Sequence, residues 1–235
     1  MWSGPRNLST AMMRSFENRA DTHVWDEPFF APWLAATGKD HPGRAESLDA
    51  HETDPAKVAE QCQQAPPDGE TLYFQKHMPH HMEADFPLAW TKTCWHFFLI
   101  RRPDAVIASY AKGRAEFDMN DIGFWPQIRM YEYLIGEGHD IPVVDSDDIL
   151  DNPKGILSSL CRALDIPFDA AMLSWPAGPR DTDGAWAPWW YKSVEASTGF
   201  APPKREKPAV PQKYQNILSE CQPAYEQLYE KRITA

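Results

Sequence analysis

A short loop near the start of the chain gathers residues that suit anion binding: Gly4, Pro5, Arg6, Asn7, Leu8, Ser9 and Thr10. A short apolar segment precedes this loop, and apolar residues follow it at helical spacing. At such a strand-to-helix junction, unpaired backbone N–H groups of the helix N-terminus bind anions, and the two hydroxyls and the guanidinium add to them. The loop therefore predicts a phosphate site, and the alternative is an N-capped helix after a turn.

A second set of anion-binding side chains follows the apolar segment 95–100. Arg101 and Arg102 stand where this predicted strand ends, and Ser109 lies eight residues after Arg101. The planar guanidinium fork matches a phosphate group, and a serine on the next helix would hold the same group from another side. The alternative is a pair of surface arginines that offset an acidic protein. Two such sites at successive strand ends indicate a ligand with phosphates at both ends.

Clusters of histidine and aspartate raise the question of a metal. His77, His80 and His81 lie close in sequence, but a proline separates them and no second half of a site follows, so we predict no metal there. The aspartates at 145, 147 and 148 suit Mg²⁺ or a helix cap, and at the junction of a strand and a helix we favour the cap.

Alternating apolar and amphipathic segments must position these loops. Strand-like runs at 71–76, 95–100 and 141–144 and an extended run before Asp26 and Glu27 are interleaved with helical patterns, whereas residues 35–70 are polar and either irregular or helical. A C-terminal helix is predicted to be interrupted or bent near Pro223. Only three residues precede Gly4, so the first strand is short or the chain starts further upstream. The pattern predicts an α/β three-layer sandwich with a central parallel sheet and a P-loop-like phosphate-binding loop.

Composition limits the classes of protein that fit. With 235 residues, 43% of them hydrophobic, the chain can bury a core, and we expect one domain over residues 1–235. The formal charge of −11 argues against a nucleic-acid partner but not against a small anion, which senses the local field of its pocket. No apolar run approaches the roughly 20 residues of a membrane span, no signal peptide is recognisable, and the four cysteines form no CxxC pair. We therefore expect a cytoplasmic protein with reduced thiols and no integral membrane segment.

The order of these motifs resembles that of the sulfotransferase family that uses 3′-phosphoadenosine 5′-phosphosulfate (PAPS). The resemblance covers roughly residues 1–170 and is carried by GPRNLSTAMMRSF, DEPFF, QKHMP, LIRRPDAVIASY and VVDSDDILDNPKGILSSLCRALDIPF. It implies a single sulfotransferase-like domain with PAPS as the donor. The 5′-phosphosulfate would lie on the loop from Gly4 to Thr10, and the 3′-phosphate would lie on Arg101 and Ser109.

The resemblance also implies catalytic roles. Arg6 takes the place of the family's loop lysine, where it would neutralise charge on the leaving phosphate, although a planar fork differs from a point charge. Glu27 resembles a glutamate before Phe-Phe that some branches use as a base, and His77 is similar to the histidine of the family's K-T-H-L-P segment. Both remain candidates for the base that takes the acceptor's proton, with Asp26 as a third.

Beyond residue 170 the resemblance weakens, and several interpretations stay open. In the Trp-rich segment 186–200 and just after it, Lys192, Lys204 or Arg205 could reach a phosphate, and the tryptophans could stack on adenine, join the core or line the acceptor pocket. The favoured function is sulfuryl transfer from PAPS to a hydroxyl of a small or lipid-like acceptor. One alternative is a P-loop kinase-like enzyme, although the Walker A pair GK[ST] is missing. Another is a nucleotide-binding protein without catalysis.

Overall fold

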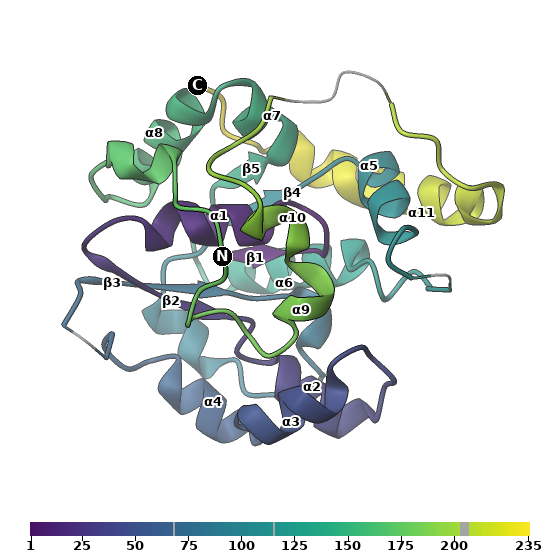
Figure 1. The fold of residues 1–235 in the computed structure, drawn as a ribbon, viewed down its shortest axis with the longest axis horizontal. Helices are drawn as coiled ribbons and strands as arrows, with labels where there is room; N and C mark the ends of the chain where they lie inside the picture. The colour runs from purple at the N-terminus through teal and green to yellow at the C-terminus, as the bar shows by residue number, and fades with distance from the viewer. Residues whose placement is uncertain (68, 115, 203–206) are drawn as a thin grey trace.

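Short parallel strands form the centre of the fold (Figure 1): β1 (Trp2–Ser3), β2 (Thr22–Asp26), β3 (Leu72–Lys76), β4 (Phe98–Ile100) and β5 (Val143–Asp145). The computed structural model describes residues 1–67, 69–114, 116–202 and 207–235. The strands pair in the orders β1-β4-β5 and β2-β3. Ser3 N–H donates to the His77 carbonyl (3.0 Å), and His77 N–H donates to the Met1 carbonyl (2.9 Å). These two hydrogen bonds join the β1-β4-β5 strands to the β2-β3 pair. The resulting parallel order is β2-β3-β1-β4-β5.

Helices connect these strands. The α-helices are α1 (Ser9–Glu17), α2 (Phe30–Thr37), α3 (Arg44–Ala50), α4 (Pro55–Gln61), α5 (Pro103–Tyr110), α6 (Phe124–Gly136), α7 (Ser146–Asp151), α8 (Pro153–Ala163), α9 (Ala187–Trp190), α10 (Lys192–Glu195) and α11 (Gln215–Tyr229). Short 3-10 helices are η1 (Pro79–His81), η2 (Ala89–Thr93), η3 (Ala170–Leu173) and η4 (Gln212–Tyr214). In the described part of the chain, no helix is long and apolar enough to cross a membrane.

The sheet buries both of its faces because successive strand residues point to opposite sides. In β4, Phe98 and Ile100 join an apolar core with α2, α5, α6 and α11, whereas Leu99 joins a second core with α1 and α8. Val143 and Val144 of β5 divide in the same way. This arrangement of a parallel sheet between two helical layers confirms the predicted α/β fold class.

Two elements differ from their predicted form. The strand predicted over 95–100 is confined to Phe98–Ile100, whereas the segment 35–70, predicted as irregular or helical, contains the helices α3 and α4. Helix α11 runs without interruption through Pro223. Pro223 and Ser219 both lie on the exposed side of α11, where water can satisfy the carbonyl that loses its N–H partner.

Candidate functional site

The loop between β1 and α1 presents an uncapped helix N-terminus. Arg6 and Leu8 adopt left-handed backbone angles (φ 63° and 65°), and Leu8 occupies the N-cap position with no side-chain hydrogen bond to the first turn. Ser9 and Thr10 are therefore first-turn residues and not caps. Asn7 fixes the loop, because its side-chain amide donates to the Leu99 carbonyl (3.1 Å). The first-turn N–H groups of α1 have no side-chain cap and are suited to an anion, so the capped-helix alternative does not hold.

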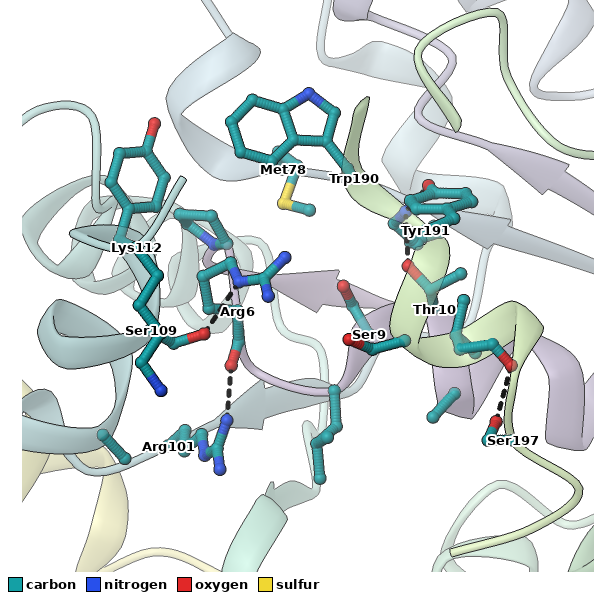
Figure 2. Close-up of a pocket in the computed structure, with 18 of the residues that line it drawn as sticks. Arg6, Ser9, Thr10, Met78, Arg101, Ser109, Lys112, Trp190, Tyr191 and Ser197 are labelled. Atoms are coloured by element: carbon teal, nitrogen blue, oxygen red, sulfur yellow. Dashed lines mark hydrogen bonds between the residues drawn. The ribbon is translucent and has the colours of Figure 1, made fainter. Parts of the chain in front are cut away.

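The two anion sites predicted from separate motifs meet in space (Figure 2). Arg6 Nε donates to Ser109 Oγ (3.0 Å), and an Arg101 Nη donates to the Arg6 carbonyl oxygen (2.9 Å). Within the described residues, neither guanidinium pairs with a carboxylate, and the buried Nε of Arg101 has no hydrogen-bond partner. Burial, and for Arg6 the nearby Arg101 charge, lowers the pKa of both groups. Two partly buried guanidiniums that make no ion pair within the described residues are suited to a bound anion.

One cavity of about 540 Å³ brings the loop, two strand ends and a late segment together. Of the predicted cofactor-binding residues, those that line it are Pro5, Arg6, Leu8, Ser9, Thr10, Arg101 and Ser109. Gly4 and Asn7 do not line it but shape the loop, since a Cβ on Gly4 would lie 3.2 Å from the Ile122 carbonyl oxygen. The volume lies in the range of small-molecule sites.

Glu27 lines the same cavity at the end of β2. Its backbone is left-handed (φ 42°), its side chain is 9% exposed, and its Oε1 lies 2.8 Å from Lys76 Nζ. Burial raises the pKa of Glu27 to about 7, against the lowering effect of the Lys76 charge and with a further upward contribution from Asp26. A carboxylate with such a pKa can accept a proton near neutral pH.

His77 lies elsewhere. It follows β3 and is buried between Trp2 and Trp90, with ring centroids 4.8 Å from each, and it is not among the residues that line the cavity. Burial and the chain's amino terminus lower its pKa well below the ordinary value. The side chain of β3 that faces the cavity is that of the preceding residue, Lys76, because neighbours on a strand point to opposite faces.

Lys76 belongs to a buried polar cluster that sequence reasoning did not assemble. Its ammonium contacts Asp26 Oδ1 (2.6 Å) and the Tyr191 hydroxyl (2.6 Å), and the Tyr191 hydroxyl also donates to Asp26 Oδ2 (2.5 Å). The ammonium further reaches the Thr10 hydroxyl in the first turn of α1 (3.5 Å). The only sequence signal for this cluster was that Asp26 and Lys76 both end apolar segments.

The remaining polar candidates have other surroundings. His80 and His81 line the cavity as neutral imidazoles, with pKa values lowered by burial. Over the described ranges, no group of three or more His, Cys, Asp or Glu residues is arranged to hold a metal ion. Asp145 caps α7 by accepting the Asp147 N–H (2.8 Å), and Asp148 binds Arg232 (2.8 Å), so these two aspartates serve the fold. The Asp147 side chain lines the cavity and pairs with Arg102 (3.2 Å).

The late segment covers the cavity. Trp186, Trp190 and Tyr191 line it together with residues around α10, as Figure 2 shows for Trp190 and Tyr191. Lys192 is exposed and does not line the cavity, and Lys204 and Arg205 lie outside the described residues. Lys112, which the sequence analysis did not single out, does line it (Figure 2).

A model of the sulfotransferase domain matches residues 1–232. The chain belongs to the sulfotransferase family. Two solved sulfotransferase domains share its fold. The domain from the Synechococcus PCC 7002 olefin synthase has a TM-score of 0.54 and 16% identity and covers 93% of this chain and 92% of its own. The domain from the curacin biosynthetic pathway has a TM-score of 0.51 and 15% identity, with 100% and 97% covered.

Two longer relatives of this sulfotransferase-family chain come from Arabidopsis thaliana. They are the branched-chain-amino-acid aminotransferase-like proteins 2 and 1, which are 37% and 38% identical over 225 residues. The match covers 95% of this chain and 40% of each relative, so the chain spans less than half the length of these relatives.

Proposed function

We propose that the protein transfers a sulfuryl group from PAPS to a hydroxyl group of a small or lipid-like acceptor. One observation carries this proposal: the loop at Ser9 and Thr10, the Arg101–Ser109 pair and the Glu27 carboxylate all face a single cavity. Membership of the sulfotransferase family supports the reaction type. The donor, the acceptor class and the residue roles are the proposed parts.

The residues fit a donor that carries phosphate groups at two places. The unpartnered Nε of Arg101, which lines the same cavity as Ser109, suits the 3′-phosphate, while the uncapped first turn of α1 suits the 5′-phosphosulfate. Arg6 belongs to the loop before α1 and contacts both residues of the proposed 3′-phosphate site, because its carbonyl oxygen accepts from Arg101 and its guanidinium donates to Ser109. This side chain can therefore add positive charge to the site.

When PAPS is bound, it supplies a sulfuryl group on a good leaving phosphate. The protein must then hold donor and acceptor in line, stabilise the charge that develops on the leaving oxygen, and remove the hydroxyl proton. We assign the charge stabilisation to Arg6 and the first turn of α1. We assign the removal of the hydroxyl proton to Glu27, which lines the cavity, and not to His77, which does not line it. The acceptor oxygen gains the sulfur, the phosphate oxygen loses it, and the proton moves to the Glu27 carboxylate.

Calorimetry with the desulfated product 3′,5′-diphosphoadenosine tests the donor site without an acceptor. We expect binding by the wild type and about 10- to 100-fold weaker binding by Arg101→Ala, since charge-assisted hydrogen bonds contribute roughly 1.5–3 kcal/mol. The matched control is Arg129→Ala, an exposed arginine on α6 that does not line the cavity. Absence of binding by the wild type, or equal binding by Arg101→Ala, would reject the proposal. Hydrolysis of ATP with Mg²⁺ would favour the kinase-like alternative.

Two further predictions belong to this proposal. The four cysteines are free thiols, three of them buried, which agrees with a reducing compartment, and we propose the cytoplasm. We also propose that residues 1–235 act as one sulfotransferase domain with a small-molecule acceptor.

A further inference from the structure

We propose that Lys76 is a positioning residue that holds the Glu27 carboxylate between the donor loop and the segment that covers the cavity. This inference rests on the proposed function, in which Glu27 is the base.

Lys76 is an unusual residue to find in this place. Its side chain has no exposed surface, and burying an ammonium group is costly unless paired groups compensate. A packed apolar side chain would satisfy a purely structural position at the end of β3. Two carboxylates lie beside it: Asp26 is in register with Lys76 at the end of β2, and Glu27 follows directly after that strand. The cluster therefore consists of one cation and two carboxylates.

The hydrogen-bond partners of Asp26 and Glu27 differ, and this difference gives the two carboxylates different roles. Both oxygens of Asp26 are bonded, Oδ1 to Lys76, and Oδ2 to the Tyr191 hydroxyl and the Gly184 N–H (3.2 Å). Glu27 is bonded to Lys76 through Oε1 alone. Its Oε2 lies 3.8 Å from His81 Nδ1, beyond hydrogen-bond distance. Lys76 thus fixes one oxygen of Glu27 and leaves the other available to a hydroxyl in the cavity.

The same ammonium also connects the three parts of the site. It reaches the Thr10 hydroxyl at the start of α1 (3.5 Å) and the Tyr191 hydroxyl beside α10 (2.6 Å). Displacing this lysine would therefore change the placement of Glu27 relative to both the donor loop and the covering segment. A residue that only filled space would not couple these positions.

The charges that face Glu27 determine its protonation. They are Lys76 from β3 and Asp26 from β2, with the neutral His81 from η1 and the Tyr191 hydroxyl nearby. Lys76 favours the ionised carboxylate, whereas burial and Asp26 favour the protonated one. Without the lysine charge, Glu27 should stay protonated to higher pH and could not accept a proton near neutral pH.

The decisive experiment follows the titration of Glu27 directly. Protein labelled with ¹³C at the glutamate side-chain carboxyl is titrated by NMR, and Glu27→Gln identifies the resonance. We expect a midpoint near 7 in the wild type. Lys76→Met should raise this midpoint by about one pH unit or more, and Asp26→Asn should lower it. Lys76→Arg, which keeps the charge, should restore it toward the wild type, and the exposed Lys154→Met on α8 should leave it unchanged.

The double variant Asp26→Asn/Lys76→Met keeps the test valid if Lys76→Met alone misfolds. It removes both charges of one buried pair, so no buried charge of that pair is left without its partner. Relative to Asp26→Asn, it should raise the Glu27 midpoint. An unchanged midpoint in this comparison would overturn the inference.

Cleavage of PAPS with water as the acceptor provides the second readout. We expect the acid limb of the pH profile to move with the NMR midpoint, and kcat to fall by about 10-fold or more in Lys76→Met at pH 7 while KM for PAPS changes little. If the midpoint moves but the wild type never cleaves PAPS, the proposed function fails. If PAPS is cleaved and the pH profile of cleavage is the same in Lys76→Met as in the wild type, the positioning role fails.

Discussion

Replacing Glu27 by glutamine should make the protein more stable at alkaline pH while removing its proposed base. The pKa of Glu27 is raised from 4.5 to about 7, first by burial and then by Asp26, despite the opposing Lys76 charge. Below pH 4.5 the carboxyl is protonated in both the folded and the unfolded chain. Between pH 4.5 and 7 only the unfolded chain releases the proton, so the free energy of unfolding falls as pH rises.

The size of this effect follows from the two pKa values. A difference of about 2.5 pH units, at about 1.4 kcal/mol per unit, corresponds to about 3 kcal/mol. Glutamine resembles the protonated carboxyl in shape and never ionises. We therefore expect equal stability of wild type and Glu27→Gln near pH 4.5, and a variant more stable by about 3 kcal/mol at pH 8.

Urea unfolding followed by tryptophan fluorescence at pH 4.5, 6 and 8 measures this difference. In thermal unfolding at pH 8, the variant should melt about 6–12 °C above the wild type. Glu220→Gln, an exposed glutamate on α11, is the matched control and should show no comparable dependence on pH. The reasoning would be refuted if the difference in unfolding free energy between Glu27→Gln and the wild type did not change with pH. It would also be refuted if the wild type became more stable relative to the variant toward pH 8.

Two other substitutions separate chemistry from folding. Glu27→Gln should lower PAPS turnover by about 100-fold or more, with the affinity for 3′,5′-diphosphoadenosine largely kept. His77→Gln should lower turnover by less than about tenfold. Equal losses of turnover in the same assay would show that His77 belongs to the catalytic site. Arg14→Met should destabilise the fold by roughly 3–5 kcal/mol in urea unfolding. Arg14 is 1% exposed and binds Asp183 (2.6 Å), so its loss leaves a buried carboxylate unpaired, and a cost below about 1 kcal/mol would contradict this.

The sequence carried enough information to predict the fold class and the position of the loop between β1 and α1. Both depend on local signals: apolar runs that become strands, and the strand-to-helix junctions after β1 and β4. Because parallel strands share one orientation, these junctions had to lie at the same edge of the sheet, and Arg6 and Ser109 are in contact there.

The cluster around Lys76 could not be predicted in the same way. Asp26 and Lys76 meet through the register of β2 and β3, which pairs residues 50 positions apart. Tyr191 lies 115 positions after Lys76 in the sequence. Neighbouring strand residues face opposite sides, so choosing between Lys76 and His77 required knowledge of which face of β3 borders the cavity. The sequence supplied the residues but not that face.

The left-handed backbone angles at the cavity bear on how this protein responds to selection for stability. Among the described residues, four that are not glycine have a positive φ, and three of them, Arg6, Leu8 and Glu27, line the cavity. Each such conformation costs about 1–2 kcal/mol, which glycine would relieve. Screens that reward thermal stability alone should therefore accumulate glycine at these positions. The resulting variants would melt higher but would lack the Arg6 and Glu27 side chains on which the proposed reaction depends, so any engineering of this protein must select for turnover at the same time.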